Sequence, residues 1–266
     1  MALSGLRDDL SALALEPYSV VVFGSLALGT WRAATSDINV ALVLSRADAV
    51  TLRRLGPALG RARKAARVTP IIFERGELPD MADAFAVKLA HIRAHHVVII
   101  GADPFADLRI DPEHLRVRIE QELRNQLVRL RRKISELGHD ALGAARIVLA
   151  AVTPLAIELE AALALTRQRR PDEGGLPVLT RQRRPDDVGP PVQPDENEAG
   201  LRATFEAAAR RFDLDAPLLM RLADLREAVT RDAAPDAIDM IDRLLGVLER
   251  AADFVHRWQP ARGNTT

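Results

Sequence analysis

The chain has 266 residues, with 37 basic and 37 acidic side chains and no cysteine. This length fits one large domain or two small ones, and 48% hydrophobic residues can fill a core, which excludes general disorder. The missing cysteines exclude disulfide scaffolds, thiol catalysis and cysteine-bound metals, while zero net charge and 4% aromatic residues argue against a dedicated nucleic-acid binder.

The first hundred residues alternate between helical and strand patterns. The opening leucines recur at helical spacing, and two apolar runs, Tyr18–Phe23 and Ile38–Leu44, are typical of buried strands. A helix is expected over 47–66, a third strand over 68–73 and a fourth over 97–100. This order predicts an α/β (α+β) domain built around a small sheet.

The second half has helical patterns only. Asp111-Pro112-Glu113 combines an N-cap residue, a first-turn proline and a first-turn acid, which predicts a helix from there to about Leu137. A second helix is expected from Ala141 to about Thr166, kinked at Pro154. Together with three further predicted helices they form an α-helical bundle, the later ones spanning about 198–212, 217–231 and 235–258.

A 14-residue unit occurs twice in succession, as Leu165–Val178 and Leu179–Val192. Its proline, glycine and charge content predicts an exposed, flexible insert in the bundle, at 166–197. An arginine patch for an RNA or phosphate partner is the alternative. The domain prediction is therefore a sheet domain over 1–110 and a helical bundle over 111–262.

The stretch Val21–Leu44 holds the residues with the clearest chemistry. Gly24 lets the backbone approach a ligand closely, and the Ser25 hydroxyl, with free N–H groups at the start of a short following helix, can hold a phosphate. Asp37 and Asn39 alternate with Ile38, so both leave one face of a strand. Oxygen ligands beside a phosphate cradle predict a site for Mg²⁺ and a triphosphate.

Phe23-Gly24-Ser25, eleven intervening residues and Asp37-Ile38-Asn39-Val40 resemble the signature of the DNA polymerase β type nucleotidyltransferase superfamily, which includes aminoglycoside nucleotidyltransferases and the small MNT antitoxin proteins. That signature has a second metal-binding carboxylate where this chain has Asn39. A third carboxylate, the general base, is also missing from the next strand, where Thr69 or Pro70 stands.

A second segment, Ala84–Phe105 followed by the helix after Asp111, resembles a bacterial subgroup of nucleotidyltransferase-like proteins. The subgroup has a proline where this chain has Ala86 and a glutamate where it has Lys88. The resemblance covers about residues 15–135. It implies a nucleotidyltransferase fold with a small mixed sheet and an α-helical C-terminal domain.

The resemblance implies Mg²⁺-dependent transfer of a nucleoside monophosphate from a nucleoside triphosphate to an unknown acceptor. It implies that Asp37 and Asn39 serve as the catalytic and metal-binding residues. The alternative is a catalytically degenerate nucleotide-binding or regulatory module, similar to an antitoxin, because losing metal carboxylates removes charge that the reaction needs. The nucleotide-binding residues would be Gly24, Ser25, Ser36 and Lys88, the last of which also fits an ordinary surface lysine.

Partners and location are expected to follow from the same pattern. A nucleoside triphosphate and an unknown acceptor are expected as ligands, and a second copy of the chain or another protein as a further partner. Binding to a nucleic acid or to a membrane is not expected. Arg7, Asp8 and Asp9 interrupt the apolar pattern that a signal peptide requires, and no run approaches the roughly 18 apolar residues of a membrane helix. The expected location is the cytoplasm.

Two clusters have competing interpretations. His91 and His95, at i and i+4, suit a zinc ion, but no third ligand follows at regular spacing, so a helix-end or surface role for these residues and His96 is favoured. The arginines over Arg116–Lys133 alternate with glutamates, which predicts a salt-bridged solvent face, although some could face a ligand.

Overall fold

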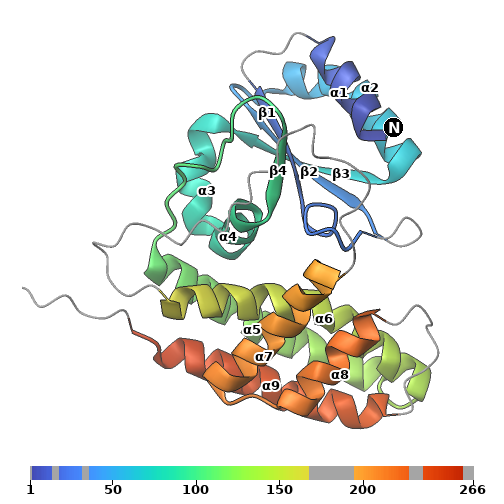
Figure 1. Cartoon of the computed structure of the whole chain (residues 1–266), viewed down its shortest axis with the longest axis vertical. Coiled ribbons are helices and arrows are strands. Elements are labelled where there is room, and N and C mark those ends of the chain that lie inside the picture. The colour runs from blue at the N-terminus through green and yellow to red at the C-terminus, as the bar shows by residue number, and fades with distance from the viewer. Residues whose placement is uncertain (1, 14–17, 32–35, 168–194, 228–235, 260–266) are drawn as a thin grey trace, which may run out of the picture. The chain divides into compact units, whose positions relative to one another are not determined.

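The computed structural model describes residues 2–13, 18–31, 36–167, 195–227 and 236–259 (Figure 1). Within them the chain is α+β, with a four-stranded mixed sheet and an α-helical part, as predicted. Internal contacts divide it into two compact units. Unit 1 is mainly Met1–Asp83 with Lys88–Arg109, and unit 2 is mainly Ile110–Leu176 with Glu198–Thr266, while the short stretch Ala84–Val87 groups with unit 2.

Unit 1 contains the sheet, whose strand order is β3-β2-β1-β4. The central strand β1 pairs antiparallel with β2 and β4, whereas β2 and β3 are parallel. Figure 1 shows α1 and α2 on one side of the sheet and α3 and α4 on the other. In chain order the elements are α1 (Ala2–Ser11), β1 (Tyr18–Phe23), β2 (Ile38–Leu44), α2 (Ala49–Ala66), β3 (Val68–Glu74), the 3₁₀ turn η1 (Arg75–Glu77), α3 (Leu78–Ala84), α4 (Ala86–Ala94) and β4 (His96–Ile100).

The strands β1 and β2 are buried on both faces, which explains why their sequences are continuous apolar runs. Alternate residues such as Val20, Val22 and Val40 pack with leucines of α1 and α2. The residues between them, Val21 and Ala41, are fully buried as well. Both strand bounds agree with the sequence prediction, but the helix expected after Gly24-Ser25 is wrong, because residues 24–29 form turns.

Unit 2 is a bundle of helices whose core is apolar. Its elements are α5 (Pro112–Leu137), α6 (Ala141–Arg167), α7 (Asp195–Phe212), α8 (Ala216–Glu227) and α9 (Ala237–Arg257). The Asp111 carboxylate accepts hydrogen bonds from the N–H groups of Glu113 and His114, which confirms the predicted N-cap of α5. The leucine stripe of α5 is buried, and α5 packs against α6 and α9 within the bundle.

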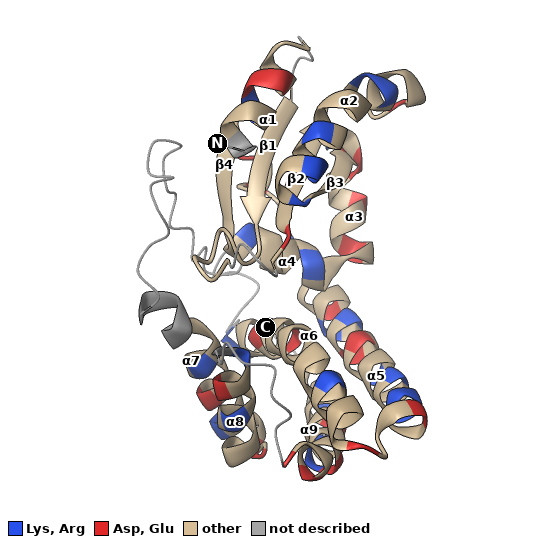
Figure 2. Cartoon of the chain, turned by 90° about the vertical axis from the view of Figure 1, so that its right-hand side faces the viewer, with Lys and Arg blue, Asp and Glu red and all other residues tan. Residues whose placement is uncertain are grey.

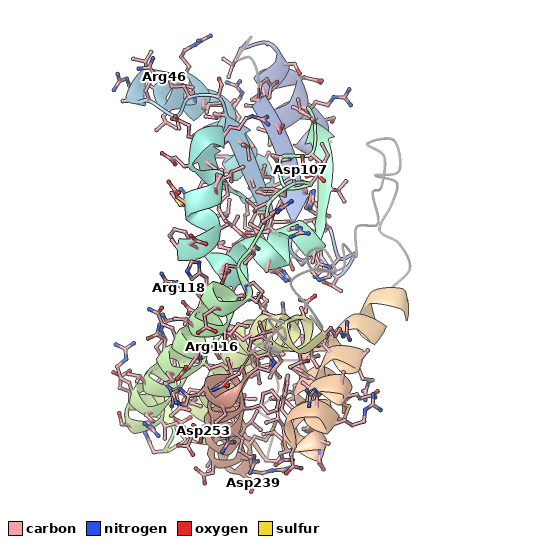
Figure 3. All side chains as sticks on the ribbon, turned by 90° about the vertical axis from the view of Figure 1, so that its left-hand side faces the viewer. Arg46, Asp107, Arg116, Arg118, Asp239 and Asp253 are labelled. Atoms are coloured by element: carbon pink, nitrogen blue, oxygen red, sulfur yellow. The ribbon has the colours of Figure 1, made fainter. Side chains whose placement is uncertain are left out.

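Charged side chains connect the outer surfaces of α5 and α9. Glu120 on α5 accepts hydrogen bonds from Arg116 and Arg124 of the same helix, and His256 of α9 lies 3.0 Å from its Oε1. Arg124 also reaches Asp253 on α9. Figure 3 labels Arg116 of α5 and Asp253 of α9. Acidic and basic residues alternate along α5 in Figure 2, so the salt-bridged face predicted from the sequence is confirmed for these residues.

Helix α6 is the most apolar of the described helices. By length and composition Ala141–Arg167 could cross a membrane, and half of its most apolar window is buried within the structure. The expectation that no stretch has enough apolar residues is therefore wrong for this helix, whose small and aliphatic residues serve the bundle core. The helix continues through Pro154. Most of the duplicated insert, predicted at 166–197, lies outside the described residues.

Candidate functional site

One residue from each strand forms a row across the sheet at the edge where β1 ends. The register pairs Thr69 of β3 with Asn39 of β2, Asn39 with Phe23 of β1, and Phe23 with His96 of β4. Laterally paired residues point to the same face of a sheet, so these four side chains, the edge row, share the face opposite α1 and α2. Gly24 follows directly after this row, and Asp37 precedes it by two residues.

Gly24 adopts a backbone conformation that favours glycine. Its φ is +72°, and a Cβ placed there would lie 3.0 Å from Nδ2 of Asn39. The amide of Asn39 therefore occupies the space beside the glycine, and any side chain at position 24 would be strained and crowded. The sequence predicted that both residues belong to one site. The structure brings them together, but in a packing contact.

The turn after Gly24 contains backbone N–H groups that have no backbone acceptor among the described residues. The N–H groups of Leu28 and Thr30 donate to the carbonyl oxygens of Gly24 and Ser25, at 2.9 and 2.8 Å. The N–H groups of Ser25 and the two residues after it have no backbone acceptor among the described residues. Successive N–H groups of this kind in a tight turn can bind an anion, which is the chemistry that the sequence predicted for a helix start; phosphate binding here stays a prediction.

Asp37 is exposed and lies beside Arg67, which the sequence analysis did not single out. Arg67 caps α2 in the left-handed conformation, its Nε is 3.5 Å from Oδ1 of Asp37, and its guanidinium donates to the Ser36 carbonyl oxygen. Both side chains are about half exposed. Such a pair contributes about 0–1 kcal/mol, so Arg67 restrains Asp37 only weakly and a ligand could displace it. The predicted site residue Ser36 takes part through its backbone.

The donors at the edge row do not fit a two-metal centre. Mg²⁺ is bound in proteins mainly through carboxylate oxygens and water. Asp37 carries the one carboxylate at the start of β2, since Asn39 offers only an amide. The register also shows that Thr69, not Pro70, stands beside Asn39, so a hydroxyl occupies the position where the resemblance would place a general base. Asp37 and Asn39 can therefore support a weak single-ion site at best.

The remaining residues named in the sequence prediction are Lys88 and three histidines, His91, His95 and His96. Lys88 is exposed on α4, and among the described residues no hydrogen bond or ion pair joins it to Gly24, Ser25 or Asp37. The rings of His91 and His95 are adjacent, with centroids 5.1 Å apart, at the C-terminal end of α4.

His96 forms a buried polar pair with Asp103. Its Nδ1 is 2.9 Å from the carbonyl oxygen of Ile92, and its Nε2 is 3.1 Å from Oδ1 of Asp103. Because both ring nitrogens face acceptors, the imidazolium form is the one that satisfies both. Burial opposes this charge, but the bonds to Asp103 and the helix carbonyls prevail and raise the pKa of His96. A helix-end role, as favoured from the sequence, is thus observed for His96.

We expect His96→Gln to destabilise the fold by about 1–3 kcal/mol, because Asp103 loses a charged donor. A raised pKa in the folded state means that this stabilisation is complete below the unfolded value of about 6.5 and is lost as the pH rises through the folded pKa. Urea unfolding at pH 6 and pH 9 should therefore show a larger deficit for the variant at pH 6. His139→Gln, at an exposed histidine, is the control, and an equal deficit at both pH values would contradict the prediction.

No protein-family model matches the sequence, and no curated protein matches it significantly. Function must therefore be inferred from the chemistry of the edge row and of the turn after Gly24.

Proposed function

We propose that unit 1 is a nucleotide-binding module of the nucleotidyltransferase type that holds the triphosphate at the turn after Gly24 and has lost most of its transfer chemistry. The observation that supports binding is the left-handed Gly24, followed by a turn whose first N–H groups are free of backbone acceptors among the described residues. Such groups bind phosphate oxygens without any side-chain charge. The resemblance of Phe23–Ser25 and Asp37–Val40 to the superfamily signature agrees with this role.

The loss of transfer chemistry is inferred from the edge row. A transferring enzyme must neutralise charge that develops on the phosphoryl group, which carboxylate-bound metal ions normally do. Here Asn39 packs its amide against Gly24, and Thr69 stands where a base would be. Slow transfer is the second candidate function, and it is favoured by the exposed carboxylate of Asp37, which an ion accompanying the nucleotide could reach.

Calorimetric titration of the full chain with ATP, with and without Mg²⁺, tests the binding proposal. We expect Gly24→Ala to weaken ATP binding roughly tenfold, since a non-glycine residue in the left-handed region costs about 1–2 kcal/mol and the turn would rearrange. Gly60→Ala is the matched control, because nothing lies within 4 Å of a Cβ at that position. ATP binding that is unaffected by Gly24→Ala would overturn the proposed site.

Comparing the titrations with and without Mg²⁺ distinguishes a catalytically degenerate module from an active enzyme. With only Asp37 as a carboxylate, Mg²⁺ should change the ATP affinity of the wild type less than about threefold, and Asn39→Asp should increase that dependence. Incubation with labelled ATP, CTP, GTP and UTP and Mg²⁺ or Mn²⁺ then tests for transfer. Strong Mg²⁺ dependence and label transfer in the unmodified protein would replace the degenerate interpretation by an active nucleotidyltransferase.

A further inference from the structure

Helix α2 has an exposed surface that carries only positive charge. Ala49–Ala66 contains five basic residues and no acidic residue, and its buried side is formed by Leu55, Ala58 and Ala62. All five basic residues are exposed. Figure 2 shows basic residues along α2, in contrast to the mixed charges of α5. The five are Arg53, Arg54, Arg61, Arg63 and Lys64.

Four of these residues have no ion pair within the described part of the chain. The exception is Arg61, which pairs with Asp9 of α1 at 3.0 Å. Arg54 donates a hydrogen bond to the carbonyl oxygen of Leu13, but this neutral acceptor does not compensate the charge of the guanidinium. We call Arg53, Arg54, Arg63 and Lys64 the basic face. On α5, by contrast, four arginines pair with glutamates of the same helix or of α9. Unpaired basic residues are therefore not a general feature of the helices of this chain.

Helix stability does not explain the basic face. Arg63 and Lys64 lie in the last turn of α2, where positive charge offsets the helix dipole. Arg53 and Arg54 lie in the N-terminal half, where this effect is absent, and repulsion between neighbouring like charges is unfavourable. The surplus charge therefore suggests an external anion along the helix rather than a local stabilising device.

The shape of the basic face selects among anionic partners. From Arg53 to Lys64 it extends about 16 Å along the helix, comparable to about five base-pair steps of a duplex. Insertion into a membrane surface would require a continuous exposed apolar side. In α2 the exposed large apolar residues are Val50 and Leu52 near its start, and the continuous apolar side faces the sheet. Single-stranded nucleic acid is usually held by aromatic stacking, and α2 contains no aromatic residue.

We propose that the basic face of α2 binds the phosphodiester backbone of a double-stranded nucleic acid, independently of nucleotide binding at Gly24. Contacts of this kind position a duplex without reading its sequence. The zero net charge of the whole chain does not oppose this, because binding depends on the local field where positive charge is concentrated.

The test is fluorescence anisotropy of the full chain with labelled 20-base-pair DNA and RNA duplexes at several salt concentrations. Four phosphate contacts predict that affinity falls about 100-fold between 50 and 200 mM salt. Arg53→Gln combined with Lys64→Gln should weaken binding at least tenfold and reduce the salt dependence by about two phosphate contacts. Comparison of the DNA and RNA duplexes identifies which nucleic acid is preferred. Binding of either duplex with this salt dependence and this loss in the double variant supports the proposal.

The matched control is Arg131→Gln combined with Arg132→Gln, which removes the same charge from exposed, glutamate-paired positions of α5. This variant should bind duplexes within twofold of the wild type. The proposal is overturned if neither duplex binds at 50 mM salt, if both double variants weaken binding equally, or if polyglutamate or anionic vesicles bind α2 as tightly as the duplexes. Thermal melting of each variant verifies that it is folded.

Discussion

Glu158→Gln is expected to stabilise the protein at alkaline pH by about 3–5 kcal/mol relative to its effect at pH 5. Glu158 is buried in α6 and accepts a hydrogen bond from Gln126 of α5. Burial raises the pKa of its carboxyl from 4.5 to about 8. The folded state therefore binds this proton more tightly than the unfolded chain does, and stability declines as the pH rises from 4.5 to 8.

A glutamine keeps the shape and hydrogen-bonding capacity of the protonated carboxyl but cannot ionise. Urea unfolding at pH 5, 7 and 9 should show nearly equal stability for Glu158→Gln and wild type at pH 5 and a growing advantage for the variant above it. Glu136→Gln, at an exposed carboxylate of α5, provides the control and should follow the wild type at every pH. Parallel pH profiles for Glu158→Gln and wild type would show that Glu158 is ionised in the fold without cost.

Leu123→Ala should reduce the free energy of unfolding by about 2–5 kcal/mol. Leu123 is fully buried in the middle of α5, where that helix packs against α6 and α9, so truncation leaves a cavity in the bundle core. Denaturant unfolding measured on the full chain gives the loss directly. Val128→Ala, on the same helix but 65% exposed, should change stability by less than about 0.5 kcal/mol. Similar losses for both variants would contradict the assignment of the α5 stripe to the core.

The sequence alone determined the local structure of this protein closely. The runs Tyr18–Phe23 and Ile38–Leu44 match the observed strands, because continuous β-branched apolar sequence suits a strand buried on both faces. Asp111 and Pro112 start α5 as predicted, since capping uses only neighbouring groups. The short helices α3 and α4 were harder to predict, because neither has a long periodic pattern.

The candidate site was predicted only in part. Gly24, Ser25, Asp37 and Asn39 were chosen because they stand at one strand end and one strand start, and their role in nucleotide binding stays a prediction. Arg67 was not predicted. It links α2 to β3, and because β3 runs parallel to β2, a basic residue at this position lies beside the start of β2 and its Asp37.

Tertiary structure decided where these residues lie relative to one another. The antiparallel register of β1 and β2 places the Asn39 amide against Gly24, and the parallel register of β2 and β3 places Thr69, not Pro70, beside it. Likewise, only the fold separates buried His96 from its half-buried neighbour His95, which lies between α4 and β4. Helical and strand periodicity are properties of adjacent residues, whereas register joins segments distant in the chain, and a shift of one residue would move every side chain to the other face of the sheet.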